Sequence, residues 1–158
     1  MKTFGRLLLG AAVAAAIIPA LAAPTAAVAS ERAPRVGPVV APPPAGMGQV
    51  VFYRPGGMGM LVSCRVREGD AVVNRLPPGK YFVHQTTPGA HEYNVRSEAR
   101  DNLRIEVEEG ETQYVRCSIG MGIGVGRPNL SPQNRADFDR RGHGLDLLPP
   151  YVPEPEHH

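Results

Sequence analysis

The sequence predicts an all-β fold, an antiparallel β-sandwich of about seven strands with one short C-terminal helix. Three observations support this fold class. Apolar and polar residues alternate through short segments between residues 49 and 119, turn residues separate these segments at nearly regular intervals, and none of the segments has helical periodicity. Short alternating strands with frequent turns are typical of β-sandwiches and small barrels.

The first 29 residues have the three parts of a secretory signal peptide. Lys2 and Arg6 supply the positive start, residues 7–23 form an uncharged apolar run, and small residues follow at the spacing that a signal peptidase recognises. Cleavage before Ser30 is preferred over an earlier site before Ala23. We therefore expect a periplasmic or secreted bacterial protein, cleaved near Ala29.

An uncleaved membrane anchor is the alternative interpretation of this segment, because the apolar run approaches the ~20 residues that a bilayer core requires. Pro19, Pro24 and the small residues at its end argue against an anchor. The segment contains no cysteine, so a lipid cannot be attached after cleavage. No transmembrane segment is expected after signal cleavage.

Net charge argues against nucleic acid as a partner. The chain has 17 Lys and Arg against 15 Asp and Glu, and two of the basic residues leave with the signal peptide, which leaves 15 of each sign. The arginines also alternate with glutamates and form no basic stripe of the kind that a phosphate backbone requires.

Residues 30–48 form a linker rich in proline and alanine. Consecutive prolines fix φ and remove backbone donors, so this segment is expected to be extended or disordered and to stay out of the sheets. A plain spacer is favoured over a polyproline ligand for a partner, because no other motif marks the segment.

The sandwich domain is expected at residues 49–141. Its strands share β-branched or aromatic residues bounded by proline and glycine turns. They are expected at Gln49–Arg54, Met60–Arg67, Ala71–Leu76, Lys80–Thr87, His91–Arg96, Asn102–Glu108 and Thr112–Ile119. In the central strand at residues 80–87, we expect Tyr81 and Val83 to fill the core, with Phe82 and His84 on the opposite face.

The two cysteines support a covalent prediction. Cys64 and Cys117 both fall in the apolar register of their strands, and the signal peptide directs them to a compartment where disulfides persist. We predict a Cys64–Cys117 disulfide. Two separate buried thiols are the alternative. A redox-active pair is disfavoured, because the cysteines lie far apart instead of in a CxxC motif.

Residues 120–126 (GMGIGVG) do not form a phosphate-binding loop. Glycine occupies every second position, without the GxGxxG spacing or the Gly-Lys pair that such loops need. We expect a strand or loop packed closely against another backbone. A loop that contacts a ligand or partner is the alternative.

A short helix is predicted to begin with Ser131 as its cap and Pro132 at its first position, and to end at Gly142. Phe138 is expected to anchor it on the sheet, with Asp137 and residues 139–141 in solvent. The tail at residues 142–158 is rich in proline. We expect it to be mostly disordered, apart from docking of Leu145, Leu147 and Leu148.

No motif in the sequence points to catalysis, a cofactor or a metal. The histidines form no HExxH-type motif, and the serines lack a nucleophile elbow. His84 and His91 lie near one another along the chain without a carboxylate or cysteine at ligand spacing. Because these motifs are missing, we expect no catalytic, cofactor-binding or metal-binding residues. An enzyme would need a polar cleft that joins His84, His91 and a carboxylate.

A series of short motifs resembles the bacterial domain-of-unknown-function family 2846. They are Phe52-Tyr53-Arg54-Pro55, Leu76, Gly79-Lys80-Tyr81-Phe82, Pro88-Gly89-Ala90-His91, Gly110-Glu111-Thr112 and Tyr114-Val115-Arg116. The likeness spans residues 49–119. It implies a small exported or lipid-anchored protein with a β-sandwich similar to PEGA modules, and no established activity. This chain departs in lacking a lipobox cysteine and in carrying two core cysteines.

These features together predict a non-enzymatic exported envelope protein that acts as a structural or binding module. Its partner would be an unknown envelope protein or glycan. Two alternatives remain. A carrier of a small apolar ligand or glycan would need a roomy apolar cavity inside the sandwich, and a hydrolase or metal-dependent enzyme would need the cleft described above.

Overall fold

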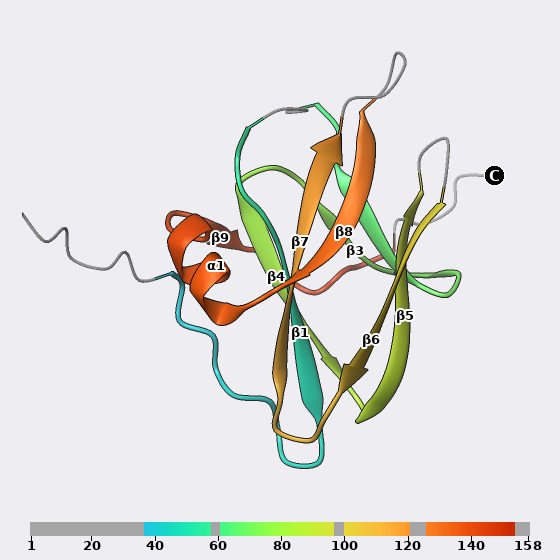
Figure 1. Cartoon of the computed structure of the whole chain (residues 1–158), viewed down its shortest axis with the longest axis vertical. Coiled ribbons are helices and arrows are strands. Elements are labelled where there is room, and N and C mark those ends of the chain that lie inside the picture. Colours follow the sequence, from blue (N-terminus) through green and yellow to red (C-terminus); the bar gives the residue numbers. More distant parts are fainter. Residues whose placement is uncertain (1–36, 58–60, 97–99, 121–125, 154–158) are drawn as a thin grey trace, which may run out of the picture. The chain divides into compact units, whose positions relative to one another are not determined.

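The structure is a computed structural model that describes residues 37–57, 61–96, 100–120 and 126–153. Contacts divide the chain into residues 1–32 and 33–158, and all described residues belong to the second unit. In this part of the chain the strands form two sheets accompanied by a single short helix (Figure 1). The all-β sandwich predicted from the sequence is confirmed.

The larger sheet has the strand order β8-β7-β1-β4-β9. Its members are β1 (Gly48–Arg54), β4 (Lys80–Thr86), β7 (Thr112–Gly120), β8 (Arg127–Gln133) and β9 (Asp146–Leu147). Every residue of β1 is buried, which explains its continuous apolar run. Gly48 starts β1 where a Cβ atom would lie 2.7 Å from the carbonyl oxygen of Glu108, so glycine allows this close approach.

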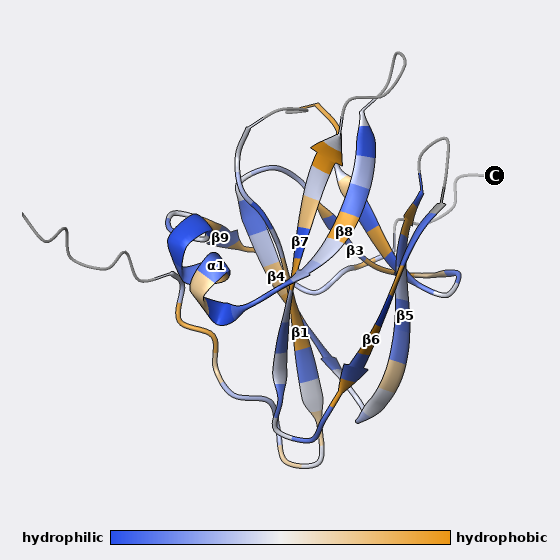
Figure 2. Ribbon diagram, in the orientation of Figure 1, coloured by the Kyte–Doolittle hydropathy of each residue, from blue (hydrophilic) through white to orange (hydrophobic). Residues whose placement is uncertain are grey.

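The smaller sheet has the order β3-β2-β5-β6 and is antiparallel throughout. Its members are β2 (Cys64–Glu68), β3 (Ala71–Leu76), β5 (Gly89–Arg96) and β6 (Arg100–Val107). Gly69 joins β2 to β3 with φ of 58°, a conformation that glycine adopts without a steric penalty. Colour changes along these strands in Figure 2 show the alternation of polar and apolar residues that marked them in the sequence.

The main core lies between the two sheets. Phe52 stacks on Phe82 with ring centroids 5.0 Å apart, and Tyr93 meets Phe52 edge-on at 5.0 Å. Aliphatic side chains of both sheets surround these rings. The inter-sheet layer is therefore a filled core of aromatic and branched residues.

A second apolar cluster lies on the outer face of the larger sheet, under helix α1 (Arg135–Arg141). Phe138 is fully buried against Tyr53, Tyr81 and Tyr114, with ring centroids 5.1 to 5.6 Å away. Figure 1 shows α1 beside this sheet, on the side away from β5 and β6. Phe138 anchors the helix as the sequence predicted.

Two pairings depart from the antiparallel prediction. β1 and β7 run parallel, and so do β4 and β9. Parallel neighbours need a crossover connection, and the chain passes through the smaller sheet between β4 and β7. The positions of the turns in the sequence do not reveal that the chain crosses to the smaller sheet and then returns to the larger one.

The predicted helix start was wrong. Ser131 and Pro132 lie in β8, which pairs antiparallel with β7. Proline is tolerated there because β8 is an edge strand and its outer side needs no ladder partner. Asn134 caps the helix instead, accepting a hydrogen bond from the Asp137 amide, and Gly142 ends it as expected.

Two predictions about side-chain placement also need correction. Phe82 belongs to the main inter-sheet core, whereas Tyr81 and Val83 face the cluster under α1, so both faces of β4 pack against apolar residues. Asp137 was expected in solvent but is 4% exposed. The predicted strand at residues 60–67 begins later, at Cys64.

The sheets extend beyond the expected domain end, because the tail adds β9 to the edge of β4. Leu145 packs on the cluster under α1, and Leu148 packs on the main core. Leu147 remains 60% exposed. The Leu148 amide donates to the carbonyl of Tyr81 at 2.8 Å, which fixes the tail along this edge.

Three sequence predictions concern residues outside those described. They are the signal peptide at residues 1–29, the first part of the linker and most of the glycine-rich run at 120–126. Within the described ranges, no helix has the length and apolar character needed to cross a membrane.

Candidate functional site

The structure brings together the two histidines that the sequence singled out, with a carboxylate between them. Glu68, at the end of β2, places Oε1 2.6 Å from His91 Nδ1 on β5 and Oε2 3.3 Å from His84 Nε2 on β4. Because β4 belongs to the larger sheet and the other two strands to the smaller one, Glu68 links the sheets. Sequence spacing gave no sign of this carboxylate.

The partners of His91 favour its protonated form. Its Nδ1 faces Glu68, and its Nε2 lies 2.8 Å from the carbonyl oxygen of Thr87, so both ring nitrogens face acceptors. Burial disfavours the charged imidazole, but the hydrogen bonds to Glu68 and Thr87 outweigh it and raise the pKa of His91.

The pKa of His84 is shifted in the opposite direction. Burial lowers its pKa, and the hydrogen bond to Glu68 offsets this only in part. Its ring meets Tyr93 edge-on, with centroids 5.8 Å apart. The cluster thus holds two imidazoles whose pKa values are shifted in opposite directions, on either side of a single carboxylate.

This arrangement is a poor catalytic or metal centre. Both oxygens of Glu68 and both nitrogens of His91 are already bonded within the protein. His84 alone of the three lines a cavity, a space of about 410 Å³ at the side of the sandwich between β3, β4 and the tail. Among the described residues, no three His, Cys, Asp or Glu side chains are placed to hold a metal ion.

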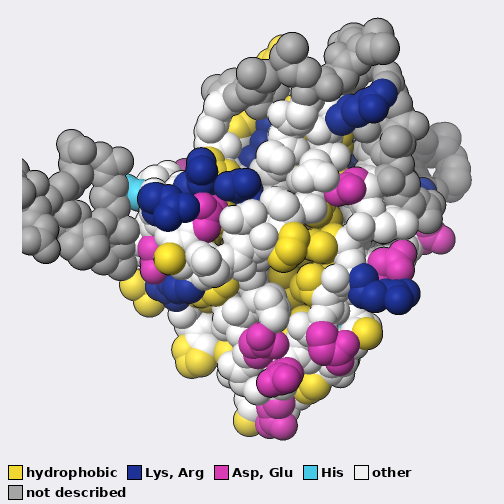
Figure 3. Space-filling model, in the orientation of Figure 1, with side chains coloured by type: hydrophobic (Ala, Val, Ile, Leu, Met, Phe, Trp, Pro, Cys, Tyr) yellow, Lys and Arg dark blue, Asp and Glu magenta, His cyan; other side chains and the backbone are white. Residues whose placement is uncertain are grey.

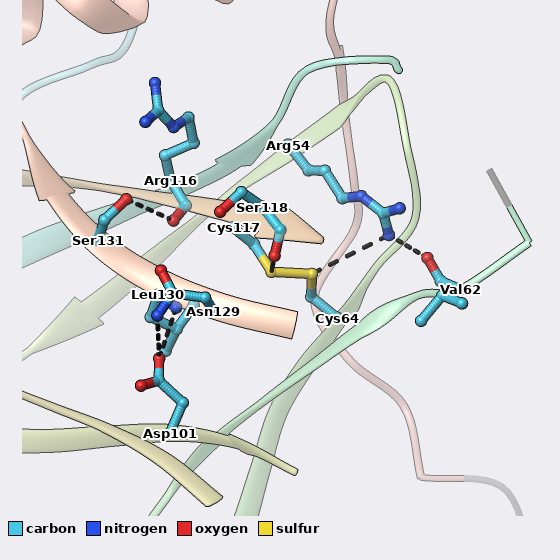
Figure 4. The surroundings of a disulfide bond; sticks show 10 residues. All are labelled: Arg54, Val62, Cys64, Asp101, Arg116, Cys117, Ser118, Asn129, Leu130 and Ser131. Atoms are coloured by element: carbon cyan, nitrogen blue, oxygen red, sulfur yellow. Dashed lines mark hydrogen bonds between the residues drawn. A yellow bond between two sulfur atoms is a disulfide. The ribbon is translucent and has the colours of Figure 1, made fainter. Parts of the chain in front are cut away.

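The two cysteines meet across the sheets. Cys64 on β2 and Cys117 on β7 form a disulfide with Cα atoms 6.6 Å apart, and both residues are buried in the main core (Figure 4). The bond closes a loop with a sequence separation of 53 residues. In the chain-entropy model, a loop of this size stabilises the folded state by about 4 kcal/mol.

A buried arginine lies beside this disulfide. Arg54, the last residue of β1, is 2% exposed, and its Nη1 donates to the carbonyl of Val62 and lies 4.0 Å from Cys64 Sγ. Figure 4 shows the guanidinium between these two groups. Burial lowers the pKa of Arg54. This burial was not predicted from the sequence, because an arginine at a strand end usually lies in solvent.

A pocket of about 250 Å³ opens next to Arg54. It is lined by the loop after β1, at residues 55–57, by residues 116–119 of β7, and by Arg141 at the end of α1. Arg54, Arg116 and Arg141 all belong to the lining, and Ser118 is the other polar side chain among the described lining residues. We refer to it as the arginine pocket.

Asp137 holds the arginines of this region in place. Its Oδ2 accepts hydrogen bonds from the Tyr53 hydroxyl and from Arg116, at 3.3 Å for the latter. Its Oδ1 accepts from Arg140 at 2.5 Å and Arg141 at 3.0 Å. Burial alone would raise the pKa of Asp137, but Tyr53 and the arginines lower it. The carboxylate is therefore charged and fully partnered.

The same contact explains why Tyr53 stays protonated. Burial raises its pKa, and the adjacent Asp137 raises it further. Because Tyr53 stands on β1, Arg116 on β7 and Asp137 on α1, this network joins three elements on the outer face of the larger sheet.

Comparison with known proteins gives one match. A family model described as a protein of unknown function (DUF2846) matches residues 44–127. This span includes both cysteines, Arg54 and Arg116, but α1 lies beyond it. No curated protein and no solved structure matched the chain.

Proposed function

Because the chain belongs to the DUF2846 family, whose description assigns no activity, we propose from its own residues that it is a non-enzymatic, exported module of the bacterial envelope. It binds a partner molecule through the arginine pocket. The observation that carries this proposal is the composition of the pocket, which has three arginines and no carboxylate or imidazole among its described lining residues.

Binding fits these residues better than catalysis. General acid–base chemistry needs a group that titrates near the working pH and reaches the substrate, whereas an arginine stays protonated throughout that range. The histidine and glutamate side chains that could supply such a group are occupied with one another between the sheets. Fixed cationic donors instead suit recognition of a charged group.

Export is supported by two independent features. The first 29 residues have the composition of a signal peptide. The core contains a disulfide, a bond that persists in oxidising compartments such as the periplasm.

The experiment that tests this proposal is retention of envelope material on the immobilised protein. We expect the wild type to retain one specific envelope protein or glycan, and Arg141→Glu to lose it, because the substitution reverses a charge in the pocket lining. Arg104→Glu is the matched control, since Arg104 lies on β6 with its side chain 79% exposed and outside the pocket lining.

Each variant is first checked for cooperative unfolding, so that loss of binding is not loss of fold. The proposal fails if the wild type retains no specific component in repeated experiments, or if Arg141→Glu retains it as well as Arg104→Glu does.

A further inference from the structure

The arginine pocket also indicates the chemical class of its ligand. We infer that it takes a phosphate group carried on a larger molecule, an inference that rests on the proposed binding function. Three features of the pocket support a phosphate ligand. They are the local positive charge, the hydrogen-bond donors that Arg116 and Arg141 do not use within the described contacts, and the directions from which the donors approach.

Among the described residues, the charge of three arginines at the pocket is only partly balanced. Arg116, Arg140 and Arg141 share Asp137, which is their one carboxylate partner among the described residues. This group therefore carries an excess of two positive charges. Figure 3 shows Lys and Arg side chains gathered over α1, while acidic side chains gather at the lower end of the view. A phosphate monoester carries about −1.5 to −2 at neutral pH and would complement this excess.

Arg116 and Arg141 have hydrogen-bond donors that their contacts with the described residues do not use. A guanidinium has five N–H donors, and Arg116 and Arg141 each give one of these to Asp137. Their side chains are 25% and 49% exposed, so solvent reaches both. Asp137 thus orients the two guanidinium groups without saturating them, which lowers the entropy cost of binding an anion.

The donors of the pocket approach from three elements. Arg116 comes from the middle of β7 and Arg141 from the end of α1, while Arg54 reaches the lining from β1. A phosphate monoester offers three acceptor oxygens that point in different directions, whereas a carboxylate offers two. Phosphate can therefore meet more of these donors at once.

The size of the pocket indicates that the phosphate is attached to something else. Its volume of about 250 Å³ is several times the ~30 Å³ that one water occupies in the liquid. Gly56 and Gly57 form part of the lining, and a Cβ atom at either position would meet no described residue within 4 Å. Among the described residues, the lining beside the arginines thus leaves space for the rest of a ligand.

The inference is tested by titrating the protein, purified from cells that express the full chain, with inorganic phosphate. Acetate and chloride at the same ionic strength are the comparison anions, and binding is followed by calorimetry. We expect saturable phosphate binding that is about tenfold tighter than acetate binding, since each hydrogen bond to a charged group contributes enough for such a factor.

Two neighbouring arginines provide a matched pair of variants. Arg140 and Arg141 both bond Asp137 Oδ1, but only Arg141 lines the pocket. We expect Arg141→Gln to weaken phosphate binding about tenfold, and Arg140→Gln to weaken it by less, because this variant removes a nearby charge but no donor of the pocket lining. Equal weakening by both variants would mean general charge attraction and would overturn the inference, as would phosphate binding no tighter than chloride binding.

A second set of titrations separates the sources of the phosphate. Glycerol phosphate represents a soluble or polymer-borne ester, and phosphatidylglycerol vesicles, compared with phosphatidylcholine vesicles, represent a lipid headgroup. Binding of glycerol phosphate or of phosphatidylglycerol vesicles that is lost in Arg141→Gln supports a phosphate site. The ligand that binds then identifies the source of the phosphate. If Arg141 is needed to retain envelope material but none of these phosphates binds, the proposed function stands and the phosphate inference is wrong.

Discussion

At the scale of single residues, Glu68 and Asp137 have similar positions in the network of contacts. Each is a carboxylate that accepts hydrogen bonds from side chains of more than one element. Around Asp137 these partners are arginines, whose charge does not change with pH. Around Glu68 they are histidines, so the contact between the sheets responds to pH.

The pH response has opposite signs for the two histidines. The pKa of His91 is raised in the folded state, so its contribution to stability is fully present below about pH 6.5, the ordinary value, and is lost as the pH rises through its folded pKa. The pKa of His84 is lowered, so its contribution is present above the ordinary value and is lost as the pH falls through its folded pKa.

We predict that His91→Gln destabilises the protein most at low pH, with the difference from wild type shrinking as the pH rises past neutrality. His84→Gln should instead remove part of the wild type's loss of stability on acidification. Urea unfolding between pH 5 and 8 measures both effects. The ionisable groups that face these rings are Glu68, Glu106 and the neighbouring histidine. If the free energy of unfolding depends on pH in the same way in the wild type and both variants, this cluster is not the source of the pH dependence.

At the scale of elements, α1 depends on one side chain. The helix has only seven residues, too few to be stable in isolation. Its position is fixed by Phe138 among three tyrosine rings and by the bonds of Asp137. Because Arg141 belongs to this helix, packing under Phe138 also positions part of the arginine pocket.

Phe138→Ala is therefore predicted to lower the free energy of unfolding by about 3–5 kcal/mol, the usual cost of emptying a buried aromatic site. Val152→Ala is the control, since Val152 is 79% exposed, and it should change stability by less than about 0.5 kcal/mol. Chemical denaturation measures both variants. If Phe138→Ala and Val152→Ala lower the free energy of unfolding by a similarly small amount, α1 contributes little to the stability of the fold.

The elements also show where sequence reasoning succeeds and where it stops. Alternation and turn residues located β3, β4 and β7 to within a residue or two, because these patterns are local. β8 was missed because Ser131-Pro132 has the appearance of a helix start, and only the edge position of the strand makes its prolines acceptable. The parallel partnership of β1 and β7 depends on the path of the whole chain.

The site was less accessible to prediction than the fold. Arg54, Arg116 and Arg141 come from three segments far apart in the sequence, and each resembles a solvated arginine by itself. Asp137 likewise resembled a surface residue, since its burial depends on the helix packing over Tyr53. Residues that converge only through tertiary structure leave no local pattern.

At the scale of the whole molecule, the disulfide is compatible with the proposed export. Cys64 and Cys117 connect the smaller sheet to the larger one, so their bond stabilises the sandwich at the layer where its two halves meet. Arg54 and the pocket lie directly beside this bond. The proposed export would place the bond outside the reducing cytoplasm, where disulfides persist.

The measurement that tests this account most directly is thiol labelling of the protein recovered from the periplasm, after denaturation without reductant. We predict that neither cysteine is labelled until a reductant is added. A version lacking the first 29 residues, held in the cytoplasm, should label at both positions. Labelling of both cysteines in the unreduced periplasmic protein, or failure of the full chain to reach that compartment, would contradict the account of an exported, disulfide-linked binding module.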